Sequence, residues 1–516
     1  MYLVINGDLN KYYMQTLCML FFPGATFSED ENDAALQQAE FTRIDKPDGG
    51  VTVRVRFKNG SGEASAERVG YPSELHRLDE GGLDMGQRCA RAAAGRAAID
   101  AGMQLFGCRP AWGILTGIRP AKFAADLLGA TDADGARLYN PAKVREILGS
   151  EYLVTPKKAA LAVDIAKAEQ KIVRLADDAR QPTCSIYISV PFCPTRCSYC
   201  SFVSYATKKL LALMPEYLER LCADLTDLLA YIRERKFKVL TVYIGGGTPT
   251  TLNEWQLYKL LETLNGGLAV NRLHEFTLEG GRPDTITRQK LDTAASMGVT
   301  RMSINPQTMN DEILRSIGRR HTVRQFIDAY TMAREAGIGA INTDLIAGLP
   351  GDDFAGFARS LDGVMALDPD NITVHTFCVK KSAEILRLDT EIYSRSAQET
   401  VKAVDYAQVT LNNGGYHPYY IYRQKNTVGN LENVGYAKKG TDGLYNVLMM
   451  EELHTIFAVG AGAVTKFVRT DSAGKKHIDR IFEPKYPFEY LKQDREAAMR
   501  AKTERCDAFF AEEKEV

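Results

Sequence analysis

The feature that most constrains this chain is a set of three cysteines within eight residues. Cys193, Cys197 and Cys200 directly follow the apolar run 185–190. Because that run predicts a strand, the cysteines share the loop after it, where three thiolates can converge on one site. Complete ligation of a 4Fe–4S cluster takes four cysteines, so three with no fourth nearby leave one iron open to another ligand. The pattern predicts an iron–sulfur site with an open coordination position.

The size and charge of the chain limit what surrounds this site. A length of 516 residues indicates two to four domains of about 100–200 residues each. Apolar residues make up 45% and charged residues 25%, as is usual in globular proteins. With 64 basic and 65 acidic side chains, the chain has no charge excess that would attract nucleic acid. We expect no nucleic-acid partner, and an anionic ligand must be bound by a local group of cations.

The sequence predicts a cytoplasmic chain with no membrane span. The first 23 residues hold an apolar patch at 17–22 but lack a basic leader and a small-residue cleavage site. No apolar run approaches the ~20 residues that a span needs. The other cysteines are scattered singly and are expected to be small buried side chains. A reducing compartment would keep the clustered thiols available for iron.

Between residues 185 and 380, short β-rich runs alternate with helical ones, which indicates a parallel sheet with helices outside. The expected strands are 185–190, 239–244, 275–278, 301–304, 342–346 and 372–377, and the longest helices are 214–233 and 322–336. Six units are fewer than the eight of a closed TIM barrel. The expected fold class is therefore α/β, with a partial (β/α)6 barrel whose ligands gather at the carboxyl ends of the strands.

The segments flanking the barrel are expected to mix helices and strands. Residues 1–180 read as an N-terminal α+β region of unknown role, with strands near 2–5 and 51–57 and an alanine-rich helix at 87–106. Residues 181–380 form the barrel, and residues 381–516 form a C-terminal α+β extension that covers the substrate. The sequence thus predicts three domains.

The cysteine spacing C-x3-C-x2-C after a strand resembles the signature of the radical S-adenosylmethionine (SAM) enzymes. Three segments, 187–193, 245–250 and 344–350, are similar to the oxygen-independent coproporphyrinogen III oxidase group. The tail segments 419–426 and 429–436 resemble the longer coproporphyrinogen dehydrogenase branch. The resemblance implies two cofactors, a 4Fe–4S cluster on the three cysteines and SAM, whose amino nitrogen and carboxylate chelate the open iron.

A glycine motif, residues 245–249, ends the second expected strand. Successive glycines let the backbone approach a ligand that a Cβ would exclude. The motif lacks the Gly-Lys-Ser/Thr ending of a phosphate-binding loop, which argues against nucleotide hydrolysis. By resemblance, Gly246, Gly247 and Thr248 contact the methionine part of SAM.

Polar residues at the ends of later strands match SAM-contact positions of the oxidase group. They are Glu279, Gln307, Arg319 and Asp344. A carboxylate can accept hydrogen bonds from ribose hydroxyls, and Arg319 can pair bidentately with the methionine carboxylate. Tyr187 matches a tyrosine that lies beside the cluster.

Three positions depart from the oxidase pattern. Ser189 stands where the oxidase proper carries His. If that imidazole sets the properties of the cluster or the entry of its electron, another residue must do so in this chain. Phe202 replaces a cysteine that follows the cluster. Arg282, after Gly280 and Gly281, stands where short members have a small polar residue before proline, which affects the ribose contacts.

The resemblance implies the oxygen-independent oxidative decarboxylation of coproporphyrinogen III to protoporphyrinogen IX in haem biosynthesis. A radical derived from SAM would take hydrogen from a propionate, which then loses carbon dioxide and one electron to become vinyl. The partners would be the tetrapyrrole substrate, an electron donor and an electron acceptor. Candidate cations for the substrate carboxylates are Arg320, Arg423 and Lys425. Arg119 and Lys122 either contact substrate or cap a helix.

Three alternatives remain open. A haem-binding chaperone of the same family usually carries an Asn-Xaa-Xaa-Tyr-Trp tail preceded by His, whereas residues 429–433 contain neither His nor Trp. A radical SAM enzyme could also act on another substrate. A structural zinc module could use three cysteines and a distant His, but it leaves the glycine motif unexplained. His321 and His375 are expected to be capping or core residues rather than ligands.

Overall fold

A computed structural model describes most of the chain, and the chain divides into two compact units. The described residues are 1–28, 37–75, 83–117, 119–132, 134–176, 181–200, 204–378, 390–424, 427–471 and 474–511, with the backbone alone at 390–396. One unit is Met1–Lys167 with Ile421–Glu432, and the other is Ala168–Tyr420 with Asn433–Val516. The three-domain division stays a prediction.

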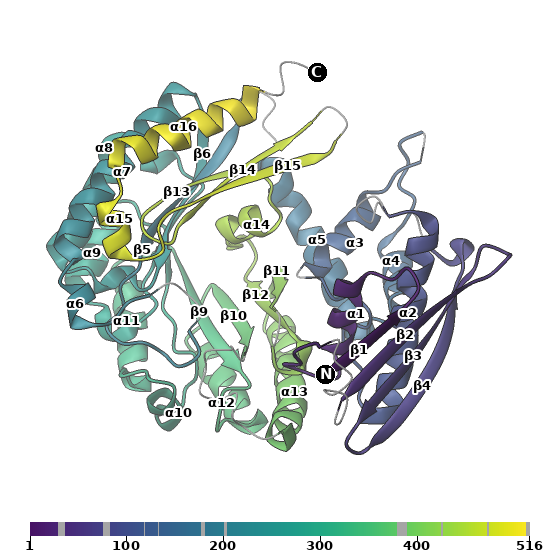
Figure 1. Ribbon diagram of the computed structural model, residues 1–516. Helices are drawn as coiled ribbons and strands as arrows, with labels where there is room; N and C mark the ends of the chain where they lie inside the picture. Colours follow the sequence, from purple (N-terminus) through teal and green to yellow (C-terminus); the bar gives the residue numbers. More distant parts are fainter. Residues whose placement is uncertain are drawn as a thin grey trace. The chain divides into compact units, whose positions relative to one another are not determined.

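The first unit contains a four-stranded sheet in the order β1-β2-β3-β4. Its strands are β1 (Tyr2–Asn6), β2 (Gln38–Asp45), β3 (Val51–Asn59) and β4 (Gly62–Gly70), and its helices are α1 (Lys11–Cys18), α2 (Met85–Phe106), α3 (Pro120–Gly129), α4 (Pro141–Ser150) and the start of α5 (Pro156–Ala176). α2 packs against β3 and β4 (Figure 1). The helix approaches β4 closely at Gly70, where a Cβ would lie 2.3 Å from the Cys89 carbonyl oxygen of α2.

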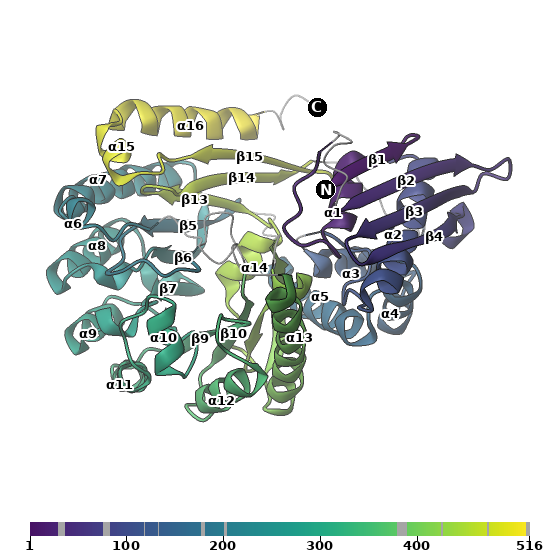
Figure 2. The same cartoon turned by 60° about the horizontal axis from the view of Figure 1, so that its bottom comes forward.

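The second unit is built on six parallel strands in sequential order, as the βα alternation predicts. They are β5 (Thr183–Val190), β6 (Lys238–Gly246), β7 (Glu275–Glu279), β8 (Arg301–Ser303), β9 (Ala340–Ala347) and β10 (Asn371–Thr376). The helices are α6 (Lys208–Leu211), α7 (Met214–Glu234), α8 (Glu254–Gly267), α9 (Arg288–Ser296), α10 (Asp311–Ser316), α11 (Val323–Glu335) and α12 (Phe354–Met365), and they cover the outer face of the sheet (Figure 2). The partial α/β barrel is confirmed.

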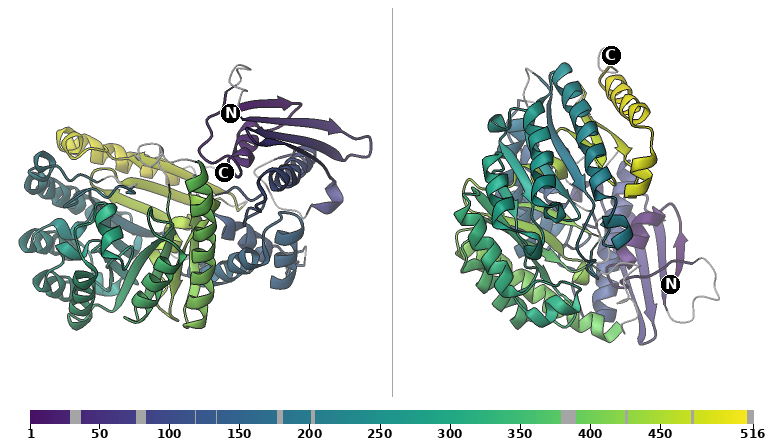
Figure 3. Two further views of the ribbon diagram at one scale, coloured as in Figure 1. Left: turned by 90° about the horizontal axis from the view of Figure 1, so that it is seen from below. Right: turned by 90° about the vertical axis from the view of Figure 1, so that its left-hand side faces the viewer.

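Later strands extend both edges of this sheet, so the barrel stays open. β12 (Glu432–Ala437) pairs antiparallel with β10, and β13 (Thr455–Val459) pairs parallel with β5. Next to these lie β11 (His417–Arg423) at one edge and β14 (Val464–Thr470) and β15 (Lys476–Phe482) at the other. The C-terminal helices are α13 (Thr390–Asn413), α14 (Leu444–Met450), α15 (Pro487–Lys492) and α16 (Arg495–Ala511), and α16 packs on α7 and β14 (Figure 3).

The two faces of the barrel sheet differ in polarity. Successive side chains of a strand point to opposite faces. On β6, Val242 and Ile244 are fully buried beneath the helices, whereas Thr241 and Tyr243 point to the inner face. The inner face is therefore polar, and the core lies between the sheet and its helices. Among the described residues, none of the helices is long and apolar enough to cross a membrane.

Candidate cofactor site

The three cysteines lie in one loop at the carboxyl end of β5. Cys193 and Cys197 are buried, and Cys200 is partly exposed. The loop turns where the Cys200 N–H donates to the Cys197 carbonyl at 3.1 Å, and it is held in place where the Ser198 N–H donates to the Ile317 carbonyl at 3.1 Å. Burial raises the pKa of the Cys193 thiol to about 11, and the neighbouring thiols of Cys200 and Cys197 add to this rise. The three cysteines are therefore held in one short loop.

The glycine motif at the end of β6 packs against this loop. Gly246 has a φ of +114°, which favours glycine, and a Cβ there would lie 3.0 Å from the backbone of Val190. A Cβ on Gly247 would lie 2.7 Å from the Phe192 carbonyl oxygen and 3.0 Å from the Cys193 sulfur. The absence of a side chain at Gly247 thus lets the backbone of the motif approach the Cys193 thiol closely.

The cysteine loop fits an iron–sulfur cluster. In the described residues, no three His, Cys, Asp or Glu side chains are gathered as a set that could hold a single metal ion. A cluster requires a wider arrangement, because each thiolate binds a different iron. The loop supplies three thiols, and the first of them lies beside a glycine at which a Cβ would come within 3.0 Å of its sulfur.

Two carboxyl side chains lie near the glycine motif, on the strands β7 and β9 that flank β8. Burial raises the pKa of Glu279 at the end of β7 to about 8, and the nearby Asp344 of β9 raises it further. Hydrogen bonds from Tyr243 and from the Gly246 N–H act in the opposite direction. Asn342 donates to Asp344 at 2.7 Å. The predicted positions Gly246, Glu279 and Asp344 are therefore brought together.

Gln307 joins this group from the segment after β8. Its φ of +70° is unusual for a residue with a side chain. The strained backbone is held by β9, because the Gln307 N–H donates to the Asp344 carbonyl and the Gln307 carbonyl accepts from the Ile346 N–H, both at 2.9 Å. The side-chain oxygen is buried and has no hydrogen-bond partner among the described residues. An unpartnered buried acceptor costs about 1–3 kcal/mol, so this one is suited to a ligand that carries an N–H or O–H.

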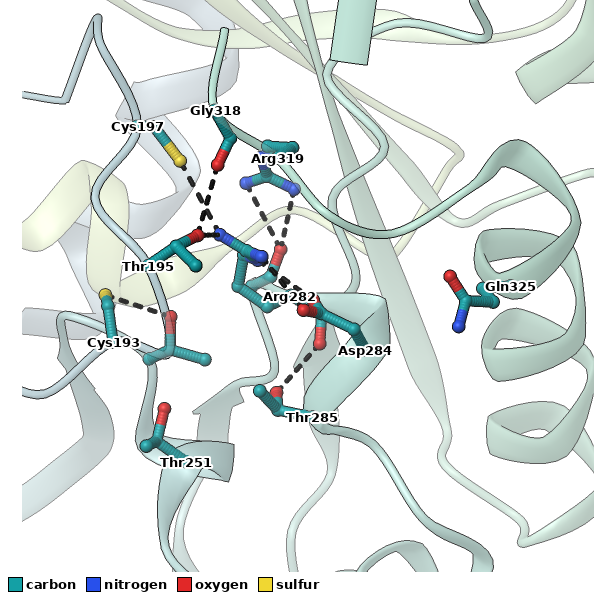
Figure 4. A network of polar contacts seen from close by, with 12 residues as sticks. Cys193, Thr195, Cys197, Thr251, Arg282, Asp284, Thr285, Gly318, Arg319 and Gln325 are labelled. Atoms are coloured by element: carbon teal, nitrogen blue, oxygen red, sulfur yellow. Dashed lines mark hydrogen bonds and ion pairs between the residues drawn. The ribbon is translucent and has the colours of Figure 1, made fainter. Parts of the chain in front are cut away.

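Arg319 is buried between the cysteine loop and the strand ends (Figure 4). Its Nε donates to the Tyr199 hydroxyl at 3.1 Å, and its Nη1 donates to the Asn305 carbonyl at 2.6 Å. Tyr199 lies within the cysteine motif, so this guanidinium also orders the loop. Its pairing with the SAM carboxylate stays a prediction, and the neighbouring Arg320 is exposed.

Three tyrosines stack inside the barrel below the glycine motif. Tyr187 of β5 lies 6.1 Å from Tyr243 of β6 and 6.2 Å from Tyr445 of α14, measured between ring centroids. Tyr243 and Tyr445 are 4.6 Å apart. Burial raises the pKa of Tyr187, and Glu279 adds to this effect. The sequence does not predict the position of Tyr445, because no local pattern around this residue indicates that it lies beside β5.

The comparisons with known proteins agree with this geometry. The model of the radical SAM superfamily matches residues 187–362. The chain is 37% identical over 379 residues to the oxygen-independent coproporphyrinogen-III oxidase-like protein HemZ of Bacillus subtilis, covering 72% of this chain and 73% of that protein. The chain belongs to the oxygen-independent coproporphyrinogen III oxidase-like group of radical SAM proteins. The cofactors of this family are a 4Fe–4S cluster and SAM.

Other relatives of this radical SAM protein are haem chaperones. The chain is 29% identical over 310 residues to the heme chaperone HemW of Bacillus subtilis, covering 59% of this chain and 77% of that protein. Coproporphyrinogen III oxidase (HemN) from Escherichia coli is a structural neighbour with a TM-score of 0.46 at 21% identity, covering 58% of this chain and 69% of that chain.

Two of the departures from the oxidase pattern are explained by contacts in this radical SAM protein. Ser189 donates from its hydroxyl to the Ala461 carbonyl at 2.8 Å and so contacts the turn after β13. Arg282 is buried and donates to Thr195 and Cys197 of the cysteine loop (Figure 4). From the sequence, Arg282 is notable only as a difference from the short oxidases near the expected ribose contacts, and its contact with the cysteine loop is not predicted. Phe202 lies outside the described residues.

The two histidines occupy different surroundings. His321 is buried, and this burial together with Arg319 lowers its pKa to about 3, although Asp284 opposes the shift. Neither ring nitrogen has a hydrogen-bond partner in the described part of the chain. His375 of β10 has its Nε2 3.6 Å from an Asp344 oxygen.

The remaining candidate cations lie in the first unit or outside the described residues. Arg423 is buried and donates to the Leu115 carbonyl and, at 2.9 Å, to the Asn430 carbonyl. Arg119 and Arg423 both line a cavity of about 720 Å³. A role of Arg423 or of Lys122 in substrate binding stays a prediction, and Lys425 is not among the described residues.

Proposed function

We propose that this chain is a coproporphyrinogen dehydrogenase, a radical SAM oxidoreductase that converts coproporphyrinogen III to protoporphyrinogen IX without oxygen in haem biosynthesis. The observation that carries the proposal is the gathering of three thiols, a glycine strand end and two carboxylates at the carboxyl ends of parallel strands. Similarity to HemZ over most of both chains supports the choice of substrate class.

Cys193, Cys197 and Cys200 would hold the cluster. When bound, the reduced cluster supplies the electron that cleaves SAM and so generates the radical that abstracts hydrogen. The task of the protein is to place the substrate beside that centre and to exclude water.

Residues at the strand ends would bind SAM. Gly246, Gly247 and Thr248 lie beside the first thiol, and the buried, unpartnered oxygen of Gln307 would accept a hydrogen bond from SAM. Glu279 and Asp344 would accept hydrogen bonds from the ribose hydroxyls, and Arg319 would pair with the methionine carboxylate. The stacked rings of Tyr187, Tyr243 and Tyr445 would form an aromatic wall inside the barrel beside the site.

A tetrapyrrole substrate brings carboxylates that need cations. Arg320 is exposed immediately after the buried Arg319, so it can reach an anionic group at the mouth of the barrel. The reaction also needs an electron donor for the cluster and an acceptor for the electron that the substrate releases.

An anaerobic assay tests this function. The reconstituted protein is given a reductant, SAM and coproporphyrinogen III, and 5′-deoxyadenosine and the porphyrin products are measured by mass. We expect a divinyl product in proportion to deoxyadenosine. Deoxyadenosine without decarboxylation would overturn the substrate and leave a radical SAM enzyme acting on another compound.

A haem chaperone is the second candidate, and the similarity to HemW favours it. In this chain the tail segment, which lacks the His and Trp of the chaperone signature, makes internal contacts. The Asn433 side chain accepts the Thr376 N–H at 2.8 Å, and Glu432 is ion-paired with Lys158 at 2.6 Å. Stoichiometric haem binding with neither deoxyadenosine nor vinyl product would favour the chaperone over the oxidase.

A further inference from the structure

Arg282 is a buried cation that contacts a predicted cluster ligand. It follows the end of β7 and is 2% exposed. Its Nη1 donates to the Thr195 hydroxyl at 2.8 Å and to the Cys197 sulfur at 3.8 Å. On its other edge, Nε and Nη2 each donate to Asp284 at 2.9 Å (Figure 4).

The guanidinium is held in one orientation. The two bonds to Asp284 form a bidentate pair, which fixes the plane of the guanidinium and leaves Nη1 directed at the cysteine loop. Thr195 accepts one Nη1 bond and donates its own hydroxyl to the Gly318 carbonyl at 3.1 Å. These partners leave Nη1 aimed at the sulfur of Cys197 rather than at solvent.

A fixed cation beside a ligand sulfur changes the electronic properties of a cluster. Hydrogen bonds to the sulfurs and nearby charge both set the reduction potential of iron–sulfur centres. Reduction adds one negative charge, so a buried positive charge with an N–H···S bond stabilises the reduced form more than the oxidised form. Asp284 offsets part of this effect, because it is the counter-ion on the far edge of the guanidinium.

We propose that Arg282 is a positioning residue that acts through Cys197 to raise the reduction potential of the cluster and so eases its reduction before SAM cleavage. The inference rests on the proposed placement of the cluster, but not on the identity of the substrate. Arg282 lies in the segment after β7 that departs from the short oxidases. The inference gives this residue a role in setting the potential of the cluster, in a chain where Ser189 replaces the histidine of the oxidase proper.

The test is a potentiometric titration of the reconstituted full-length protein, followed by electron paramagnetic resonance in the absence of substrate. Arg282→Gln removes the charge and the N–H···S bond, so we expect a lower midpoint potential at unchanged iron and sulfide content. Arg282→Lys keeps the charge but cannot span Asp284 and Cys197 together, and it should give an intermediate value. Arg288→Gln is the matched control, because Arg288 is exposed and pairs with Asp292 at 2.8 Å, and it should match the wild type.

A second variant protects the test against poor folding. Asp284→Asn keeps the guanidinium and removes its counter-ion, so the midpoint potential should rise above that of the wild type. If Arg282→Gln titrates like the wild type, or if Asp284→Asn leaves the potential unchanged or lower, the proposed role is wrong. Iron and sulfide retained after Cys197→Ala would instead contradict the placement of the cluster, on which the inference rests.

Discussion

The Thr248 hydroxyl oxygen lies 3.3 Å from the sulfur of Cys193, so the glycine motif that ends β6 touches the cysteine loop that ends β5. Cys193 and Thr248 are 55 positions apart in the chain, yet their side chains touch.

Cys197→Ala should abolish iron loading and SAM cleavage, because the loop would keep only two thiolates for the cluster. The measurements are the cluster absorbance and the iron and sulfide content after anaerobic reconstitution. Cys222→Ala, at a buried and solitary cysteine of α7, should load like the wild type. Unchanged cluster absorbance in Cys197→Ala would contradict the ligand assignment.

Gly247→Ala should displace the cysteine loop, since the new Cβ would lie 2.7 Å from the Phe192 carbonyl oxygen. We expect a loss of about 1–3 kcal/mol in the free energy of unfolding and lower iron content, measured by urea titration of the apoprotein and by iron assay. Gly266→Ala on α8 has no atom within 4 Å of its new Cβ and serves as the control. Equal iron content in the two variants would show that the motif does not shape the loop.

Asp344→Ala should weaken SAM binding while the cluster stays intact. The carboxylate lies beside Glu279 at the strand ends but is not part of the cysteine loop. Isothermal titration of SAM into the reconstituted protein gives the affinity, and the absorbance spectrum reports the cluster. If the SAM affinity equals that of the wild type, Asp344 does not belong to the site.

Glu279 should make the stability of the apoprotein depend on pH. Its pKa rises from 4.5 to about 8 on folding, mainly through burial, so the folded state holds a proton that the unfolded state releases between these values. The stabilising contribution of the neutral carboxyl is complete below pH 4.5 and is lost as the pH rises through about 8. Each pKa unit corresponds to about 1.4 kcal/mol.

Glu279→Gln removes this titration, and urea unfolding at pH 5, 7 and 9 would detect it. The stability of the wild type relative to the variant should fall steadily as the pH rises. A difference that does not change with pH would mean that the carboxyl is not buried in its neutral form.

Glu432→Gln should destabilise the first unit. Glu432 is fully buried, pairs with the Lys158 ammonium at 2.6 Å and accepts from the Trp112 Nε1 at 2.7 Å. Removing one partner of a buried ion pair costs about 3–5 kcal/mol, because the other charge stays buried. In thermal unfolding, Arg54→Gln at the exposed pair with Glu67 should cost at most about 1 kcal/mol. Equal costs would contradict the burial of the Glu432 pair.

Local sequence patterns were sufficient to predict the barrel. The six β-rich runs correspond to β5 through β10 with bounds that differ by at most a few residues, because each strand carries its own apolar face and its own turn signals. The cysteine loop was placed correctly for the same reason, since it directly follows the β5 run. The glycine motif likewise ends β6 as predicted.

The contacts that complete the site were decided by the tertiary structure. Tyr445 lies in the stack with Tyr187, and Arg282 reaches the sulfur of Cys197, although each pair is far apart in the chain. The pairing of β13 with β5 is a contact of the same kind. Periodicity and turn residues report the conformation of a short segment, whereas these contacts depend on where the whole chain places two distant segments. The sequence by itself therefore determined the strands, the cysteine loop and the family resemblance, and only folding decided which side chains surround the thiols.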